Sequence, residues 1–164
     1  MTWCLNCILS TLLLLAAANG GPVLARKLLK KRHANPVDGG LTLPDTHPLF
    51  GRSKTWRGFA AGILAGALTA WPLGFTPLTG AGFALLALLG DLFTSFCKRR
   101  LGKVESSRAR GFDTVPESWL PAWAYANQLG LGNQDIALVV LLFFLLEEFV
   151  SPLLYKWHIR LRPY

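Results

Sequence analysis

Residues 59–96 read FAAGILAGALTAWPLGFTPLTGAGFALLALLGDLFTSF, and Asp91 is the one charged residue among them. Thr76 and Pro77 divide this stretch into two apolar segments, 59–75 and 78–96. A helix needs roughly 20 residues to cross the hydrocarbon core of a bilayer, so each segment is close to the required length. The stretch therefore predicts two membrane-spanning helices that are joined by a tight turn.

Three further apolar segments accompany this pair, at 3–25, 119–131 and 136–155. The segment 119–131 is short, and it is either a marginal span or a re-entrant segment. The chain of 164 residues is 52% hydrophobic and 16% charged, whereas soluble domains carry about 25% charged residues. The apolar excess excludes intrinsic disorder, and the 3 cysteines exclude a disulfide framework. We predict an all-α, polytopic membrane protein in which residues 1–164 form a single integral-membrane domain.

The distribution of positive charge predicts the topology. The 17 basic residues outnumber the 9 acidic ones and fall into groups at 26–32, 52–57, 98–110 and 156–162. With about five transmembrane helices and the N-terminus out, every group lies on the side of the C-terminus, which is in the cytoplasm. The cytoplasmic loops are then 26–58 and 97–118. We expect the first segment to remain as an anchor, because its basic residues follow the apolar stretch instead of preceding it.

Asp91 is energetically unfavourable within a membrane helix, because its side chain is a carboxylate. A carboxylate at the centre of a span costs at least about 2.5 kcal/mol on insertion scales, so it normally faces a cavity or a partner. Asp91, Ser95 and Lys98 share one helical face, because residues at i, i+4 and i+7 lie above one another. This face predicts a polar, cytoplasm-facing site, although a structural pairing of Asp91 with an inner arginine is the alternative.

A second polar cluster, LFGRSKTWRG at 49–58, precedes the second apolar segment. Arg52, Lys54 and Arg57 lie there at the start of a helix, where backbone N–H groups and the helix dipole favour a phosphate. Their alternative role is to anchor the chain at the membrane surface. Asp91 and Asp113 could both bind a divalent cation together with phosphate oxygens. For Glu147 and Glu148, a structural pairing and a functional role both stay open.

Three blocks of sequence, in a fixed order along the chain, resemble the pattern of a known protein family. The blocks are Pro36-Val37-Asp38-Gly39, Phe50-Gly51-x-x-Lys54-Thr55-x-Arg57-Gly58 and Gly90-Asp91-x-x-x-Ser95-x-x-Lys98-Arg99-Arg100-x-Gly102. Over residues 36–113 the chain resembles the CDP-archaeol synthase family, whose members are related to the phosphatidate cytidylyltransferases. The resemblance implies transfer of CMP from CTP to a membrane lipid phosphate, which gives a CDP-lipid and pyrophosphate. The family usually continues with D-Q-x-D, whereas this chain reads DTVPE at 113–117, so the second metal ligand is open.

The resemblance also implies roles for particular residues. Catalysis falls to Lys54, Asp91, Ser95 and Lys98, substrate binding to Asp38, Arg52, Thr55, Arg57, Arg99 and Arg100, and Mg²⁺ binding to Asp91 and Asp113. The implied enzyme lies in the inner (cytoplasmic) membrane of a prokaryote, and its active site faces the cytoplasm.

Two other functions compete with this one. A non-enzymatic anionic-lipid-binding or transporter-accessory protein would bind acidic lipids without nucleotide. A CDP-alcohol phosphotransferase would carry the motif D-G-x-x-A-R, but Asp38-Gly39 is followed here by Gly40-Leu41-Thr42-Leu43. Nucleic acid is disfavoured as a partner, because the basic groups are tethered to the ends of membrane helices. The type of lipid tail stays open. The oligomeric state also stays open, and a homo-oligomer is one of the alternatives.

Overall fold

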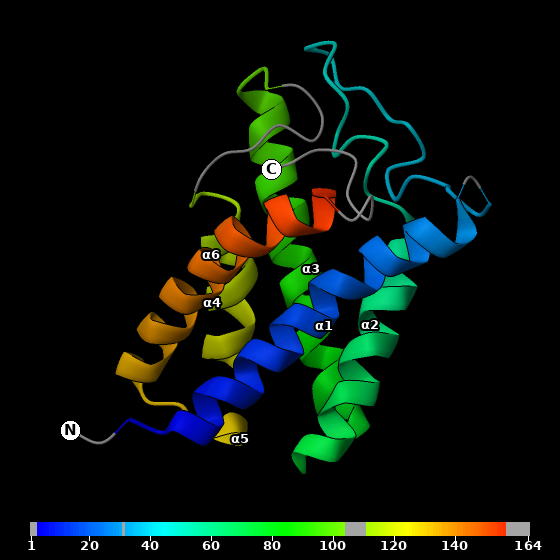
Figure 1. The fold of residues 1–164 in the computed structure, drawn as a ribbon. Coiled ribbons are helices and arrows are strands. Elements are labelled where there is room, and N and C mark those ends of the chain that lie inside the picture. Colours follow the sequence, from blue (N-terminus) through cyan, green and yellow to red (C-terminus); the bar gives the residue numbers. More distant parts are fainter. Residues whose placement is uncertain (1–2, 31, 104–110, 157–164) are drawn as a thin grey trace.

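The computed structural model describes residues 3–30, 32–103 and 111–156, with side chains as far as residue 150. Its elements are α1 (Leu5–Leu29), α2 (Trp56–Ala70), the 3-10 turn η1 (Trp71–Leu73), α3 (Pro77–Arg100), α4 (Thr114–Ala124), α5 (Ala126–Leu129) and α6 (Asn133–Lys156). Figure 1 shows these helices and the long loop that joins α1 to α2. Within the described residues this loop makes only isolated bridges, Pro36 with Thr55 and Thr42 with Pro48. The mostly helical fold agrees with the all-α prediction.

Close packing of α1, α2 and α3 depends on glycines. A Cβ atom built on Gly62 would lie 2.7 Å from the carbonyl oxygen of Ala18 in α1. A Cβ atom on Gly66 would lie 2.6 Å from the carbonyl oxygen of Gly80 in α3. Such distances leave no room for a side chain, so the small residues let the backbones approach as membrane helices commonly do. Threonine side chains begin two of these helices, because Thr55 accepts a hydrogen bond from Gly58 N and Thr76 accepts one from Thr79 N.

Hydrogen bonds and ion pairs show which helix ends meet. At one end of the molecule, the backbone N–H of Cys4, just before α1, donates to Asp135 Oδ1 at the start of α6 over 3.3 Å. At the other end, Arg57 at the start of α2 donates to the carbonyl of Lys30 just after α1. Lys98, near the end of α3, pairs with Asp113 before α4. The basic ends of α1 and α3 therefore gather at one end of the helices, whereas Arg108, Arg110, Arg160 and Arg162 lie outside the described residues.

The predicted segment 119–131 is divided in the structure. It corresponds to the second half of α4 and the short helix α5, which are separated at Tyr125. The 11 residues of α4 rise only about 16 Å, roughly half the thickness of the hydrocarbon core. The side chain of Tyr125 explains the position of the break, because its ring packs edge-on against Phe83, 6.1 Å between centroids, and its hydroxyl reaches Gly82.

Other helix bounds also differ from the predicted segments. The helix α1 continues beyond residue 25 to Leu29, and the segment 59–75 becomes α2 followed by η1. The third segment, 78–96, corresponds to α3 and the last, 136–155, to α6. Sequence hydropathy underestimates the lengths of α1 and α3, because both helices continue into basic residues at their carboxyl ends.

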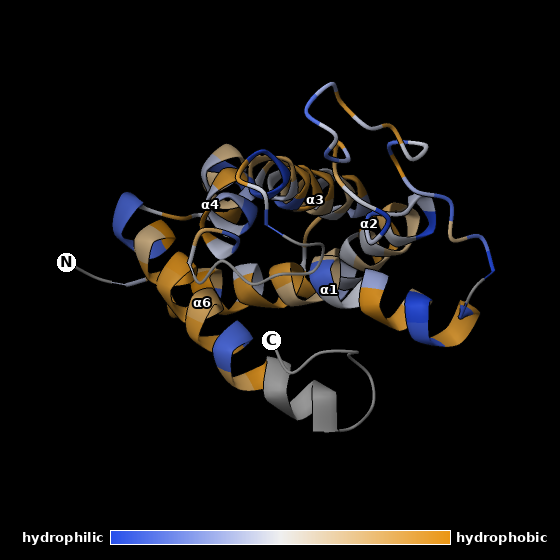
Figure 2. Cartoon of the chain, turned by 90° about the horizontal axis from the view of Figure 1, so that it is seen from above, coloured by the Kyte–Doolittle hydropathy of each residue, from blue (hydrophilic) through white to orange (hydrophobic). Residues whose placement is uncertain are grey.

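Apolar side chains cover much of the outer surface. Leu78 is 81% exposed and Phe149 is 76% exposed, while Leu14, Leu15 and Phe83 are fully buried. Figure 2 shows that α1 and α6 are mostly hydrophobic, and that hydrophilic residues appear at the carboxyl end of α1. Two helices, Leu5–Leu29 and Pro77–Arg100, are long and apolar enough to cross a membrane among the residues that the structure describes. The number of spans and the orientation stay predictions.

Candidate functional site

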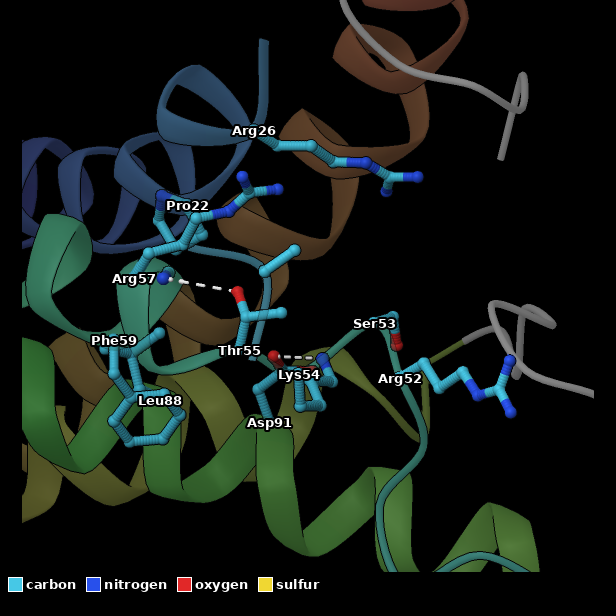
Figure 3. A pocket seen from close by; sticks show the side chains of 12 residues that line it. Pro22, Arg26, Arg52, Ser53, Lys54, Thr55, Arg57, Phe59, Leu88 and Asp91 are labelled. Atoms are coloured by element: carbon cyan, nitrogen blue, oxygen red, sulfur yellow. Dashed lines mark hydrogen bonds and ion pairs between the residues drawn. The ribbon is translucent and has the colours of Figure 1, made fainter. Parts of the chain in front are cut away.

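An ion pair joins the loop before α2 to the middle of α3. Lys54 Nζ pairs with Asp91 Oδ2, although the two residues are 37 positions apart in the chain. Their side chains are 21% and 25% exposed, so the pair is partly shielded from water. The alternative, in which Asp91 pairs with an inner arginine, differs from the structure, where Lys54 of the loop is the partner. Figure 3 shows the two side chains pointing toward each other.

This ion pair lies in the wall of a pocket of about 350 Å³. The cationic side chains of the wall come from three segments of the chain, and they are Arg26 of α1, Arg52 and Lys54 of the loop, and Arg57 of α2. The acidic residue of the lining is Asp91. Apolar side chains, Pro22, Phe59 and Leu88, complete the wall among the helices. The pocket thus presents positive charge beside an apolar surface at the ends of α1 and α2.

Asp38 organises the loop that carries the cations. Its Oδ2 atom accepts hydrogen bonds from the backbone N–H of Phe50 (2.9 Å) and Gly51 (3.1 Å), and its Oδ1 atom accepts one from Gly40 (3.0 Å). Gly51 has a φ of 100°, which a residue with a side chain rarely adopts. Burial raises the pKa of Asp38, but the backbone N–H donors outweigh it and hold the pKa below its ordinary value of 3.8. Asp38 is therefore a charged organiser of the turn that leads to Arg52 and Lys54.

Thr55 and Arg57 both line the pocket and hold the backbone in place. The Thr55 hydroxyl accepts from Gly58 N and begins α2. The Arg57 guanidinium donates to the carbonyl oxygens of Lys30, at 2.7 Å, and of Arg32. Arg57 therefore fixes the path of the chain where it leaves α1, and it does so from the rim of the pocket.

The other predicted residues of α3 lie toward α4. Lys98 Nζ is 2.9 Å from Asp113 Oδ1, and the Lys98 residue is only 8% exposed. Ser95 and Arg99 are buried, at 3% and 4% exposed. The lining of the pocket does not include Ser95, Lys98, Arg99 or Asp113. The structure thus separates the predicted site into a pocket around Lys54 and Asp91 and a buried polar layer between α3 and α4.

Asp91 and Asp113 are the two carboxylates that the family resemblance implies as ligands of Mg²⁺. Within the described residues, no group of three or more His, Cys, Asp and Glu side chains could hold a metal ion. Asp91 and Asp113 each pair with a lysine. Mg²⁺ in nucleotide enzymes is bound through one or two carboxylates plus substrate phosphates. Asp91 and Asp113 thus have the chemistry of ligands for a magnesium ion that arrives with a nucleotide.

Two features of the site were missed by sequence reasoning. Arg26 lines the pocket, but its group of basic residues at the end of the first segment was interpreted only as a topology signal. Asp45 pairs with Arg100 over 2.6 Å, and nothing local in the loop sequence indicates this. For Glu147, the structure favours the structural alternative, because Thr114 Oγ1 donates to Glu147 Oε2 over 2.7 Å and joins α4 to α6.

Comparisons with known proteins give a consistent result. The family model described as "CarS-like: CDP-archaeol synthase" matches residues 5–77. The CDP-archaeol synthase of Hyperthermus butylicus is 48% identical over 92 residues, which cover 52% of each chain. That of Aeropyrum pernix is 37% identical over 137 residues, which cover 78% of this chain and 75% of the relative. The chain thus spans about half the length of several relatives that it matches.

A solved structure extends the comparison to nearly the whole fold. It belongs to an intramembrane enzyme for archaeal membrane lipids biosynthesis and superposes with a TM-score of 0.70 at 32% sequence identity. The superposition covers 87% of this chain and 91% of the other. The sequence match to the Aeropyrum pernix protein likewise covers most of both chains. On these grounds, the chain belongs to the CDP-archaeol synthase family.

Proposed function

We propose that this protein is a CTP-dependent cytidylyltransferase, which moves CMP from CTP onto a membrane lipid phosphate and releases pyrophosphate. The observation that carries the proposal is the Lys54–Asp91 ion pair inside a cationic pocket. The names of the relatives add to it, because each is a CDP-archaeol synthase. The pocket volume of about 350 Å³ is within the range of small-molecule sites.

The charges of the pocket suit a triphosphate that meets another phosphate. Arg26, Arg52, Lys54 and Arg57 provide four positive side chains against the single carboxylate of Asp91 in the lining. The approach of two anions is the main obstacle to phosphoryl-type transfer, so catalysis depends on positioning and on neutralising charge. Partial exclusion of water strengthens the attraction between the cations and the phosphates. We propose that these side chains lower the barrier in this way.

The reaction requires no nucleophile from the protein. A phosphomonoester has a second pKa of about 6, so the lipid phosphate already carries a nucleophilic oxygen near neutral pH. This oxygen forms a bond to the α-phosphorus of CTP, while the bond from that phosphorus to the bridging oxygen of pyrophosphate breaks. We propose that Lys54 and Arg57, which line the pocket, screen the phosphates. The buried layer of Ser95, Lys98 and Arg99 is proposed to support the site from the side of α4.

Asp91 has two tasks in this proposal. It orients Lys54 through the ion pair, and it would hold Mg²⁺ when the nucleotide brings it. Asp113, which lies in the layer beside the pocket, is proposed as the second ligand. Bound there, the metal would neutralise charge on the phosphate oxygens. Lys98, which pairs with Asp113, keeps that second carboxylate near the end of α3.

The membrane placement follows from the same proposal. Residues 1–164 would form one integral-membrane domain with about five transmembrane helices, N-terminus out and C-terminus in. The pocket lies at the basic ends of the helices, so it would face the cytoplasm of a prokaryotic cell. Pro22, Phe59 and Leu88 give the pocket an apolar wall among the helices, which supports a substrate whose tails stay in the bilayer.

The test is a transfer assay with the purified full chain in lipid nanodiscs. Labelled CTP and Mg²⁺ are incubated with lipid phosphates that carry either isoprenoid ether or diacyl tails. We expect pyrophosphate release and a labelled CDP-lipid that require one tail class. Binding of anionic lipids without any dependence on nucleotide would instead support the accessory-protein alternative and refute the transferase.

A further inference from the structure

The tip of the loop between α1 and α2 folds into a small hairpin, residues 42–48. Thr42 and Pro48 form an isolated bridge, Leu43 N donates to His47 O, and Thr46 N donates to Leu43 O. Leu49 N donates to Leu41 O and closes the base of the hairpin. The loop that carries Lys54 and Arg52 therefore has an ordered tip, although no regular strand supports it.

One arginine of α3 holds this hairpin. Arg100 Nη1 donates to Asp45 Oδ2 over 2.6 Å, and Arg100 Nη2 donates to the carbonyl oxygens of Pro48 (2.8 Å) and His47 (3.2 Å). The guanidinium also lies 5.3 Å from the centre of the Phe96 ring, on the same helix. A planar fork with several N–H donors suits this kind of contact, and a lysine has no equivalent geometry.

The hairpin contact and the ion pair of the pocket connect the same two segments. Lys54 of the loop pairs with Asp91 of α3, and the hairpin of the same loop is bound by Arg100, further along α3. Between the two contacts, Asp38 accepts the backbone N–H groups of Phe50 and Gly51. The loop is thus fixed to α3 at two points, the hairpin and Lys54, and Arg52 lies between them in the chain.

From this arrangement we propose that Arg100 and Asp45 are positioning residues, which hold the loop so that Lys54 and Arg52 face the nucleotide. The family resemblance implies that Arg100 binds the substrate, but its Nη1 and Nη2 atoms donate to the hairpin instead. It is also absent from the lining of the pocket. The inference rests on the proposed function, since the nucleotide is the CTP of that reaction.

Loss of the contact between Arg100 and the hairpin should raise the KM for CTP, because the loop then occupies more than one position. When the hairpin contact is weakened, only a fraction of the molecules present the loop correctly, and the apparent KM rises by the inverse of that fraction. Saturating CTP restores the correct position, so kcat is retained. Because Asp45 and Arg100 are 41% and 24% exposed, we expect a rise in KM of about two- to fivefold.

The experiment compares D45A, R100A, R100K and the double variant D45A/R100A, with K103A as the control. Lys103 is an exposed cation just after α3, so K103A removes a charge without touching the hairpin. We expect both D45A and R100A to raise the KM for CTP, and R100A to raise it at least as much, because D45A leaves the bonds from Arg100 to the carbonyl oxygens of His47 and Pro48. The double variant should raise the KM no further than R100A does. R100K should behave as R100A, because it keeps the charge but loses the fork.

A direct contact between Arg100 and the nucleotide predicts a different pattern. R100A would then lower kcat, R100K would retain activity, and D45A would leave the KM for CTP unchanged or lower it. This pattern would overturn the positioning role. Asp45 is decisive here, because a carboxylate has no reason to improve the binding of an anionic nucleotide except through the loop.

Amide hydrogen exchange tests the contact without any turnover. The amides of Leu43, Thr46 and Leu49 donate within the hairpin, so they should exchange faster in D45A and R100A than in the unmodified protein or in K103A. Unchanged exchange in D45A and R100A would refute the inference. If the unmodified protein transfers no CMP to any lipid phosphate, the proposed function fails, whereas the exchange rates still decide whether Arg100 holds the loop.

Discussion

Replacing Asp91 with asparagine is the most direct perturbation of the pocket. The change keeps the size of the side chain but removes the charge that pairs with Lys54. Lys54 then stands beside Arg26, Arg52 and Arg57 with no carboxylate in the pocket lining to balance it. We therefore expect Lys54 to leave its position, and any nucleotide-bound metal to lose one of its two carboxylates.

The magnitude can be bounded from the exposure of the pair. Both side chains are less than a third exposed, so the stability cost lies between that of a surface pair and that of a buried one, at about 1–2 kcal/mol. Loss of one preorganised electrostatic group at a reacting centre typically lowers kcat by 10²- to 10³-fold. We expect D91N to lower turnover by at least about 100-fold, which is roughly 2.7 kcal/mol of transition-state stabilisation.

The assay is pyrophosphate release from labelled CTP in nanodiscs, with thermal unfolding measured in parallel. D135N is the matched control, because Asp135 accepts hydrogen bonds from Cys4 and Gly132 at the opposite end of the helices. D135N should lose stability but keep its turnover. If D91N turned over within about threefold of the unmodified protein, less than 1 kcal/mol would separate them, and the role of Asp91 in the pocket would be refuted.

Further predictions concern stability, packing and thiol chemistry. The pKa of Asp38 in the folded protein lies below its ordinary value of 3.8. The Asp38 carboxylate therefore stabilises the fold above pH 3.8, and this stabilisation is lost as the pH falls through the folded pKa. The unmodified protein should have a higher Tm than D38N near neutral pH, and the difference should disappear below the folded pKa. G66V should destabilise the protein by about 1–3 kcal/mol in chemical unfolding, because a Cβ atom at this position overlaps the backbone of α3. G20A is the control and should not lower stability, because a Cβ atom on Gly20 has no neighbouring atom within 4 Å. Thiol alkylation of the folded, unreduced protein should label Cys97 alone, because the Cys4–Cys7 disulfide protects the other two cysteines; three labels without reduction would contradict the disulfide.

Local sequence patterns were sufficient to predict four of the helices. The apolar segments correspond to α1, α2, α3 and α6, and the Thr76-Pro77 turn begins α3 as expected. The small residues of α2 lie where the backbones approach, as Gly62 and Gly66 show. These features depend on composition, periodicity and capping within a few residues, which the chain carries wherever it folds.

The division of the segment at 119–131 was decided by packing. Its apolar composition is compatible with a single helix, but the side chain of Tyr125 fits over Gly82 and against Phe83 of α3. A contact with another helix thus determines where α4 ends. Sequence hydropathy contains no information about that neighbour.

The sequence by itself determined that this protein consists of apolar helices with basic ends, that Asp91 needs a cavity or a partner, and that Lys54 is a cation at the start of a helix. Only the tertiary structure decided that they partner each other, that Arg26 joins the same pocket, and that Arg100 binds the hairpin at Asp45. The physical reason lies in the loop between α1 and α2. It has no helical or strand periodicity, and its path is set by hydrogen bonds and ion pairs to residues that are distant in the chain.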